Sequence, residues 1–473
     1  MEFESTIGLE VHVQLSTKTK IFCNCSTEFG DAPNTHTCPV CLGMPGTLPV
    51  LNKEVVEFAL RFGIATHSKI NRLSRFARKN YFYPDLPKGY QISQYELPIM
   101  EGGFIEIDVP EGKKKIRLVR THMEEDAGKL IHQGNVSFVD FNRAGVPLLE
   151  IVSEPDLHTP EEAGKYLRKI RTLVRYLKIS DGNMEEGSMR CDANVSVRKK
   201  TEGKLGTKVE VKNMNSFKHV EKALRYEIER QTQLLQNGGK VVQETRLWDE
   251  KENITRPMRS KEEAYEYRYF PEPDLVSLLI DEKWIEKVKM NMPELPDEKE
   301  ERFIKEYRLP PEKASILTES DELADYFESI CKTFHGYEQV ANWILSEFLA
   351  YLNREGKEIG EVSIKPYQVA ELLKLVDEGI ISGKIAKSVF AEMWKTNRDA
   401  SDIVREKGLI QIKDETKITQ IVCEVIEENP EVVEKYRKGK KNVIGFLAGQ
   451  VMKKTKGKAN PQLVNKILLE RLK

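Results

Sequence analysis

The sequence predicts an α+β region followed by helical regions, and two observations carry that prediction. Up to about residue 290, strand-like segments alternate with helical ones, without the strand–helix–strand rhythm of a parallel sheet. After NMPELPDEKEER, near residue 291, strand signals nearly vanish and helical periodicity takes over. We therefore expect an N-terminal domain with an antiparallel sheet and helices at 1–293, a helical domain at 294–403 and a small helical tail at 404–473.

Two β-hairpins are expected in the first region. GGFIEIDV and IRLVRTHME flank a PEGKK turn, and SMRCDANVSVRK and TKVEVKN flank a glycine-rich turn. Between the hairpins, a helix should be capped by Thr159, with Pro160 in its first position. A second helix should run from about Ser216 to the stop signal at Asn237.

The remaining chain is predicted to be mostly helical. Apolar periodicity in the middle region indicates helices over 322–333, 339–354, 365–378 and 385–395. In the tail it indicates helices over 417–428, 442–453 and 461–472, the last after the start signal GKANP.

Composition indicates a globular protein, with 40% hydrophobic and 32% charged residues in a chain of 473. The longest apolar runs fall far short of the roughly 20 residues that a membrane span needs. The acidic N-terminus lacks the pattern of a signal peptide. These features lead us to expect a cytoplasmic protein with no membrane partner.

Charge is distributed unevenly along the chain. The net charge is −1, yet from Lys435 onward there are twelve Lys or Arg residues and one acid, Glu470. A basic tail on an acidic body is typical of proteins that bind nucleic acid. A solvated helical face is the alternative, but the single sign of the charge favours nucleic acid.

Four of the seven cysteines form two close pairs. Clustered cysteines in a reducing compartment indicate a metal, and four thiolates suit a closed, structural zinc site. The one-residue gap in the first pair is tighter than usual, His36 could replace one thiol, and free buried cysteines are the alternative. The expected zinc ligands are Cys23, Cys25, Cys38 and Cys41.

Candidate cation ligands lie on strand-like segments. Glu10, His12 and Gln14 share one strand face, and Arg190, Asp192 and Asn194 share another. Taken singly, each segment fits a solvated face better than a set of cation ligands. Together, carboxylates that converge from several strands suit magnesium, which prefers oxygen ligands. The other acids of this kind are three consecutive ones at the end of the first hairpin and one inside PLLEIV: Glu124, Glu125, Asp126 and Glu150.

No Walker A, Rossmann or GxSxG motif is present, so an ATP site would have to be of another kind. Basic and aromatic residues are interleaved in the stretch 75–91, and a second stretch, 258–271, has a similar composition. Such a composition suits a loop that stacks bases and holds phosphates. A proline-pinned aromatic loop packed on the sheet is the alternative.

These motifs together resemble the B subunit of the aspartyl/glutamyl-tRNA(Asn/Gln) amidotransferase over the whole chain. The resemblance rests on IGLEVHVQL, RKNYFYPDLPKGYQISQ, RTHMEEDAGK, DFNRAGVPLLEIV, GSMRCDANVSV, VEVKNMNSF and MRSKEEAYEYRYFPEPDL, with the cysteine pairs. It implies a cradle-shaped first domain that holds ATP, Mg²⁺ and the 3′ end of Glu-tRNA(Gln) or Asp-tRNA(Asn). It also implies a heterotrimer with an amidase-type glutaminase, which supplies ammonia, and a small third protein that joins the two.

The implied reaction is phosphorylation of the side-chain carboxylate of the misacylated tRNA, followed by amidation. The resemblance assigns Glu10, His12, Glu125 and Glu150 to a metal site or a tunnel end, Asp192 to a second magnesium, and the cysteines to structural zinc. ATP phosphates would contact Lys79, Lys88, Arg190 and Lys208. The sequence does not decide whether Glu125 or its neighbour Glu124 has the role at the metal site or tunnel end. A zinc-containing tRNA-binding adaptor without catalysis remains the alternative function, and the choice between the two tRNAs is open.

Overall fold

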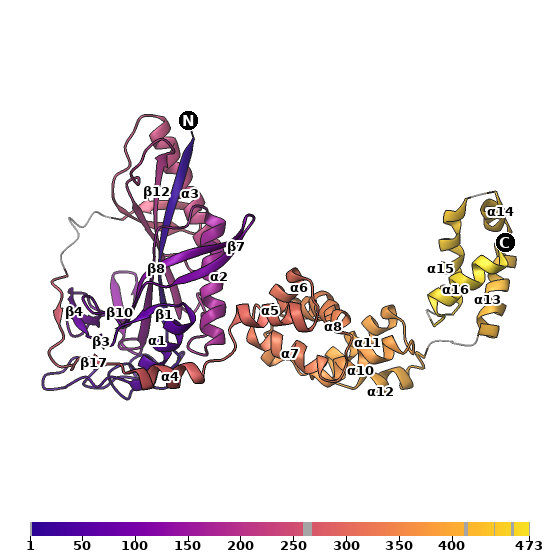
Figure 1. Ribbon diagram of the computed structural model, residues 1–473, viewed down its shortest axis with the longest axis horizontal. Helices are drawn as coiled ribbons and strands as arrows, with labels where there is room; N and C mark the ends of the chain where they lie inside the picture. The colour runs from indigo at the N-terminus through magenta and orange to yellow at the C-terminus, as the bar shows by residue number, and fades with distance from the viewer. Residues whose placement is uncertain (1, 259–266, 411–414, 439, 456–457, 473) are drawn as a thin grey trace. The chain divides into compact units, whose positions relative to one another are not determined.

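The computed structural model describes residues 2–258, 267–410, 415–438, 440–455 and 458–472, and the chain divides into two compact units, 1–296 and 297–473 (Figure 1). Three domains are predicted from the sequence, with boundaries at 293 and 403. The division into two units does not test these boundaries, which remain predictions. Arg259, Ser260 and Lys261 of the second basic and aromatic stretch lie outside the described residues.

The first unit is built around a ten-stranded sheet, counted over the described residues. Its pairs are antiparallel except β13–β14, and its central strands are β12 (Met189–Lys199), β1 (Phe3–Gln14), β11 (Pro147–Ser153) and β8 (Gly112–Glu125). The outer strands are β15 (Ile254–Pro257), β14 (Thr245–Asp249), β13 (Val209–Lys212), β6 (Met100–Glu101), β2 (Lys69–Ile70) and β7 (Phe104–Val109). Both predicted hairpins are present, as β7–β8 and β12–β13, and the α+β class is confirmed.

Helices cover one face of this sheet. α2 (Pro160–Tyr176) begins where predicted, with the Thr159 hydroxyl accepting from the backbone N–H of Glu162. α3 (Phe217–Gln236) is capped by Ser216 and packs beside α2 (Figure 1). The core between sheet and helices contains the alternate residues of β1, from Ile7 to Val13. The opposite face of β1 is thereby left for polar side chains.

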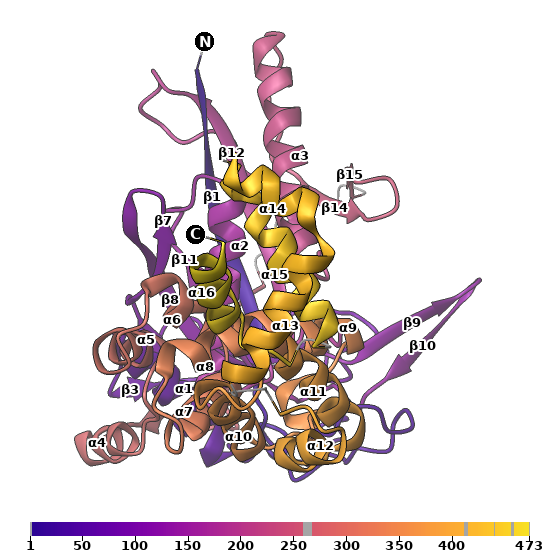
Figure 2. The same ribbon diagram turned by 90° about the vertical axis from the view of Figure 1, so that its right-hand side faces the viewer.

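Shorter elements complete the unit. α1 (Lys53–Ala65) and α4 (Glu282–Met290) contact each other, and β3 (Leu73–Ser74) pairs with β17 (Leu278–Leu279). A three-stranded sheet joins the two basic and aromatic stretches through β5 (Tyr90–Ser93), β4 (Ala77–Asn80) and β16 (Phe270–Pro271). The hairpin of β9 (Lys129–Gln133) and β10 (Val136–Asp140) projects from the unit (Figure 2).

The second unit is helical in its described part, and it contains two separate hydrophobic clusters. The first surrounds Phe327 and Phe390, and the second surrounds Val422 and Leu447. The predicted helices are found, although the one over 339–354 contains a π-turn, η1. The elements are α5 (Pro296–Glu306), α6 (Pro311–Leu317), α7 (Asp321–Cys331), α8 (Tyr337–Trp343), η1 (Ile344–Phe348), α9 (Leu349–Glu355), η2 (Ile359–Glu361), α10 (Pro366–Asp377), α11 (Gly383–Thr396), α12 (Ala400–Glu406), α13 (Glu415–Glu428), α14 (Pro430–Arg437), η3 (Lys441–Val443), α15 (Ile444–Lys454) and α16 (Pro461–Arg471).

The expected tail boundary falls inside α12, whose Ile403 and Val404 are buried in the first of these clusters. The tail's own cluster begins with Ile418. In the described parts of the chain, no helix combines the length and the apolarity that a membrane crossing requires.

Candidate active site and cysteine cluster

A row of four polar side chains crosses the centre of the sheet. In the antiparallel register, His12 of β1 lies opposite Arg190 of β12 on one side and Glu150 of β11 on the other. Glu150 in turn lies opposite His122 of β8. Because directly opposite residues share one face, residues far apart in the sequence become neighbours.

Glu150 lies between the two imidazoles. Its Oε2 atom is 3.4 Å from Nε2 of His12 and 3.4 Å from Nε2 of His122. The carboxylate of Glu124 lies 3.7 Å from each of the same nitrogens, and Glu10 lies 3.7 Å from His12. We call these five residues the carboxylate–histidine cluster.

The cluster contains two overlapping sets of ligand atoms. Glu10, His12 and Glu150 form one set, and His122, Glu124 and Glu150 form the other. Within each set the ligand atoms lie within 4.8 Å of one another. Glu150 belongs to both sets, so the two sets could be occupied by neighbouring cations that share one carboxylate.

Electrostatics inside the cluster favour bound positive charge. Burial alone would raise the pKa of Glu150, but His122 and His12 hold it well below its usual value. Burial alone would lower the pKa of His122, yet Glu150 and Glu124 raise it to about 9. Burial raises the pKa of Glu10, and the charge of Glu150 adds to the effect. The negative charges of the acids therefore favour the protonated, positively charged form of both imidazoles.

The donor set fits a divalent cation. Glu124 and Glu150 are buried, and among the described residues their carboxylates contact imidazoles and, for Glu124, the Ser93 hydroxyl at 3.1 Å. Buried carboxylates are costly unless they are paired or bind a metal. Three carboxylates suit Mg²⁺, and two imidazoles extend the range to Mn²⁺ and other transition metals.

Glu125 does not join the cluster. Strand alternation turns it to the other face of β8, where its carboxylate binds the Lys88 ammonium and accepts from the backbone N–H of Ile92 at 2.8 Å. The structure therefore brings Glu124, rather than the expected Glu125, to the candidate cation ligands. Lys88 lies with Glu125 and away from those ligands.

Three other expected residues lie beside the cluster or apart from it. Asp192 is opposite Glu10 in the register, but its carboxylate binds the Lys212 ammonium at 2.5 Å. The Arg190 guanidinium donates to Asp126 at 2.9 Å. Lys208 is exposed and precedes β13, so Lys212 rather than Lys208 supplies the cation at this edge.

Lys79 of β4 provides a half-buried cation near the cluster. Burial alone would lower the pKa of its ammonium, but the charges of Glu124 and Glu150 and the nearby Tyr269 and Tyr267 together outweigh burial, so the pKa lies above its usual value. The ammonium lies 4.9 Å from the centre of the Tyr267 ring. It forms no hydrogen bond or ion pair with the residues described, so its charge is available to a ligand.

The sequence reasoning missed His122 and did not separate Glu124 from Glu125. A signal for both was present, because His122 and Glu124 alternate along this strand with Thr121, Met123 and Glu125. Alternation across THMEE would thus have placed His122 and Glu124 on one face.

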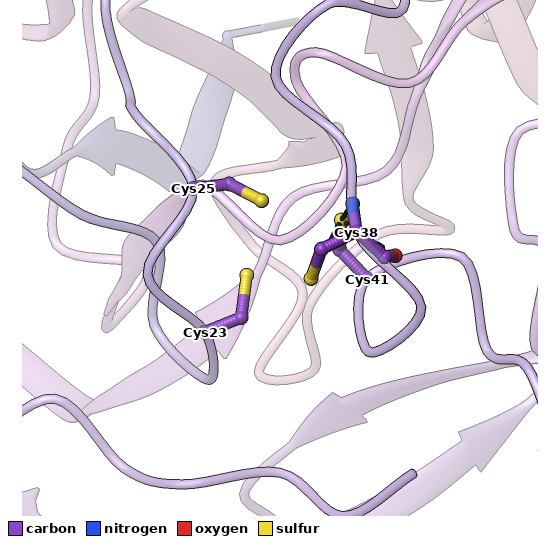
Figure 3. A group of neighbouring side chains, drawn as sticks. All are labelled: Cys23, Cys25, Cys38 and Cys41. Carbon is purple, nitrogen blue, oxygen red and sulfur yellow. Dashed lines mark hydrogen bonds between the residues drawn. The ribbon is translucent and has the colours of Figure 1, made fainter.

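The four cysteines converge as expected. Figure 3 shows the pair Cys23 and Cys25 facing the pair Cys38 and Cys41, and the four sulfur atoms lie within 4.8 Å of one another. His36 lies outside this group, since its Nε2 is 2.8 Å from Asp31. Four convergent thiols fit a closed zinc site.

A buried lysine lies against this group. The Lys20 ammonium is 3.8 Å from the sulfur of Cys41 and donates to the carbonyls of His36 and Phe141. The hydrogen bond with Cys23 and the charge of Lys20 lower the pKa of the Cys41 thiol to about 4. The lowered pKa favours the thiolate form of Cys41, which is the form that binds metal.

Comparison with known proteins defines the class of this chain. Residues 5–286 match the model of the GatB/GatE catalytic domain, and residues 325–472 match that of the GatB domain. The first match contains the whole carboxylate–histidine cluster and all four clustered cysteines.

Full-length relatives give the family. The chain is 58% identical over 474 residues to the B subunit of the aspartyl/glutamyl-tRNA(Asn/Gln) amidotransferase of Thermodesulfovibrio yellowstonii, with all of both chains covered. It is 58% identical to that of Caldanaerobacter subterraneus, with all of both chains covered, and 55% identical to that of Carboxydothermus hydrogenoformans, covering 99% of the relative. The chain belongs to this family of amidotransferase B subunits, which confirms the resemblance and the expected ligase class.

Proposed function

We propose that this chain activates the side-chain carboxylate of Glu-tRNA(Gln), Asp-tRNA(Asn) or both with ATP, and then converts it to the amide. A carboxylate oxygen attacks the γ-phosphorus of ATP, the bond to the β-phosphate oxygen breaks, and ADP leaves. Ammonia then attacks the carbonyl carbon of the acyl phosphate, loses a proton, and inorganic phosphate leaves. The observation that carries this proposal is the shared Glu150 in two overlapping sets of cation ligands.

The residues of the cluster account for the first step. Glu10, Glu124 and Glu150, with the two imidazoles, would hold divalent cations. Such cations neutralise charge on ATP phosphates when bound. The half-buried Lys79 ammonium adds a positive charge near Glu124, where negative charge develops during transfer. These groups are held by adjacent strands and need little reorganisation when the reaction occurs.

The other parts of the proposal concern the complex. An amidase-type glutaminase would supply ammonia, and a small third protein would complete a heterotrimer. The cysteine group would hold a structural zinc ion, and the basic tail would contact the tRNA backbone. The relatives' names identify them as B subunits of an amidotransferase for Asp/Glu-tRNA(Asn/Gln), which supports this assembly.

A substitution at the shared carboxylate tests the proposal. Glu150→Gln in the reconstituted complex should abolish tRNA-dependent ATP hydrolysis while leaving tRNA binding within about twofold, because the substitution leaves the basic tail unchanged. Glu4→Gln is the control, since Glu4 lies on β1 but pairs with Arg198. Normal ATP hydrolysis by Glu150→Gln, with normal tRNA binding, would favour the non-catalytic adaptor.

The substrate is decided by a direct assay. The complex is mixed with ATP, Mg²⁺, glutamine and either Glu-tRNA(Gln) or Asp-tRNA(Asn), and the amino acid released from the tRNA is analysed. Formation of glutaminyl or asparaginyl ester identifies the substrate. Formation of neither, with an active glutaminase, would contradict the proposed reaction.

A further inference from the structure

Arg120 occupies the same face of β8 as two residues of the carboxylate–histidine cluster. It precedes His122 by two positions and Glu124 by four, and alternate residues of a strand share a face. Its register partners are Val152 on β11 and Glu101 on β6, so it lies close along the strands to the row that contains Glu150. Arg120 therefore borders the cluster.

The guanidinium of Arg120 has no anionic partner among the residues that the structure describes. Its Nε is buried without a hydrogen-bond acceptor, and it forms no ion pair. Arg117 on the same strand instead binds Asp156 through two nitrogens, at 2.9 and 2.7 Å. A buried donor without an acceptor is destabilising, so a ligand that supplies the acceptor would recover that loss.

The guanidinium lies near one of two stacked aromatic rings. Its carbon lies 6.0 Å from the centre of the Tyr95 ring, which stacks on Tyr269 at 4.2 Å with an angle of 7° between the planes. Burial raises the pKa of the Tyr269 hydroxyl to about 12, and charges of Lys79, Glu124 and Arg120 also act on it. Arg120 and Lys79 thus lie around the same tyrosine, and both are cations without an ion pair in the described chain.

The chemistry of the side chain limits what it can bind. A guanidinium presents parallel N–H groups that match two oxygens of a phosphate or a carboxylate. A second unpaired cation nearby favours an anion with more than one negative charge. Arg120 also lies beside carboxylates that would themselves hold cations, which places a phosphate or carboxylate group of a substrate between the guanidinium and those cations.

We propose that Arg120 binds an oxyanion of the reacting substrates at the edge of the carboxylate–histidine cluster. The proposal rests on the function proposed above, because the oxyanion is either a phosphate group of ATP or the side-chain carboxylate of the misacylated tRNA. In either case the guanidinium donates two hydrogen bonds to a pair of oxygens. Its positive charge offsets the charge that accumulates as the phosphoryl group is transferred.

The test uses the complete amidotransferase complex with Arg120→Lys and Arg120→Ala, and with Arg117→Lys and Arg117→Ala as matched controls. kcat and KM are measured separately for ATP and for the misacylated tRNA. Both Arg120 variants should lose roughly 10- to 100-fold in kcat/KM, since hydrogen bonds to charged groups contribute about 1.5–3 kcal/mol. Lysine should restore little, because it cannot donate two parallel hydrogen bonds.

The pattern of KM identifies the oxyanion. A raised KM for ATP with an unchanged KM for tRNA assigns Arg120 to a phosphate, and the reverse assigns it to the substrate carboxylate. Methylguanidinium added to Arg120→Ala should recover part of the rate, which a purely structural defect would not show. If Arg120→Ala does not fold, Arg120→Lys and Arg120→Gln carry the same comparison.

The outcome that overturns this inference differs from the outcome that overturns the proposed function. If kcat/KM for both substrates stays within about twofold of the unsubstituted complex, Arg120 binds neither anion. The proposed function would survive that result. Absence of ATP-dependent amidation by the unsubstituted complex would instead remove the function, whatever Arg120 does.

Discussion

His12 on β1 and Glu150 on β11 face each other across adjacent strands, with Nε2 and Oε2 3.4 Å apart. The same carboxylate oxygen lies 3.4 Å from His122 on the next strand. One acid thus joins two imidazoles from opposite sides, and its removal would disturb both sets of cation ligands. Three strands that lie far apart in the sequence must pair correctly to form this arrangement.

The adjacent acids Glu124 and Glu125 should behave differently. Glu124→Gln removes a ligand of the cluster and should weaken Mn²⁺ or Mg²⁺ binding roughly tenfold or more, since these ions depend on carboxylate oxygens. Glu125→Gln, on the opposite face, should leave that affinity within about twofold. Titration calorimetry on the two variants measures the difference, and an equal loss in both would contradict the assignment.

Asp126 should contribute to stability in a pH-dependent manner. Burial alone would raise its pKa, but Arg190, Arg143 and a hydrogen bond from Gln14 hold the pKa below its usual value. Its contribution is then complete above the unfolded-state pKa of about 3.9, and is lost as pH falls through the lower folded-state pKa. Asp126→Asn should lower the free energy of unfolding by roughly 3–5 kcal/mol at neutral pH. The difference in this free energy between the variant and the unsubstituted protein should become smaller in acid.

Amide hydrogen exchange of β8 and β12 as a function of pH measures this effect in the first unit. Asp249→Asn is the control, because Asp249 forms an ion pair with Arg256 at the surface and its loss should change stability little. A difference for Asp126→Asn that stays constant down to the most acidic pH at which the protein is folded would contradict the lowered pKa.

Cysteine substitution should remove bound zinc selectively. Cys41→Ser leaves three thiols. The zinc content of the purified protein, measured by metal analysis, should therefore fall from about one zinc per chain toward zero, since closed sites use four ligands. Cys423→Ser, in the helical unit, should retain the metal. Zinc content that is unaffected by Cys41→Ser would exclude this site.

Removal of residues 410–473 should weaken tRNA binding and reduce its dependence on salt. The tail contains most of the one-sided basic charge, and each phosphate contact adds to the slope of log affinity against log salt. This truncation keeps α12, whose Ile403 and Val404 belong to the other core. Binding measured at several salt concentrations checks the prediction, and an unchanged slope would mean that the tail's charge is only solvated.

The local features of the fold could be predicted from the sequence. The hairpins, the caps at Thr159 and Ser216, and most helices each follow from a few consecutive residues. Short helices after proline, such as α6 and α14, were missed because their apolar periodicity spans only two turns. The π-turn in the helix over 339–354 has no sequence signal of this kind.

The candidate site was only partly predictable, because its geometry depends on pairing between distant strands. Alternation alone placed Glu10 beside His12, and spacing alone grouped the cysteines. Only the pairing of β11 with β8 shows that Glu150 lies beside His122. Only the position of β13 shows that Lys212, and not Lys208, lies at this edge of the site. Arg120 was missed because an unpaired cation is recognisable only when its neighbours are known.

Arg190, His12, Glu150 and His122 form one row across four strands. The site therefore depends on which face of its strand each of them occupies. Inserting one residue directly after Glu150 would exchange the two faces of β11 from that point on, and the buried side chain of Ile151 would turn toward the cation ligands. An insertion of two residues would preserve the faces and shift only the spacing. Relatives with altered lengths inside these four strands should therefore differ by even numbers, whereas the connecting loops carry no such restriction.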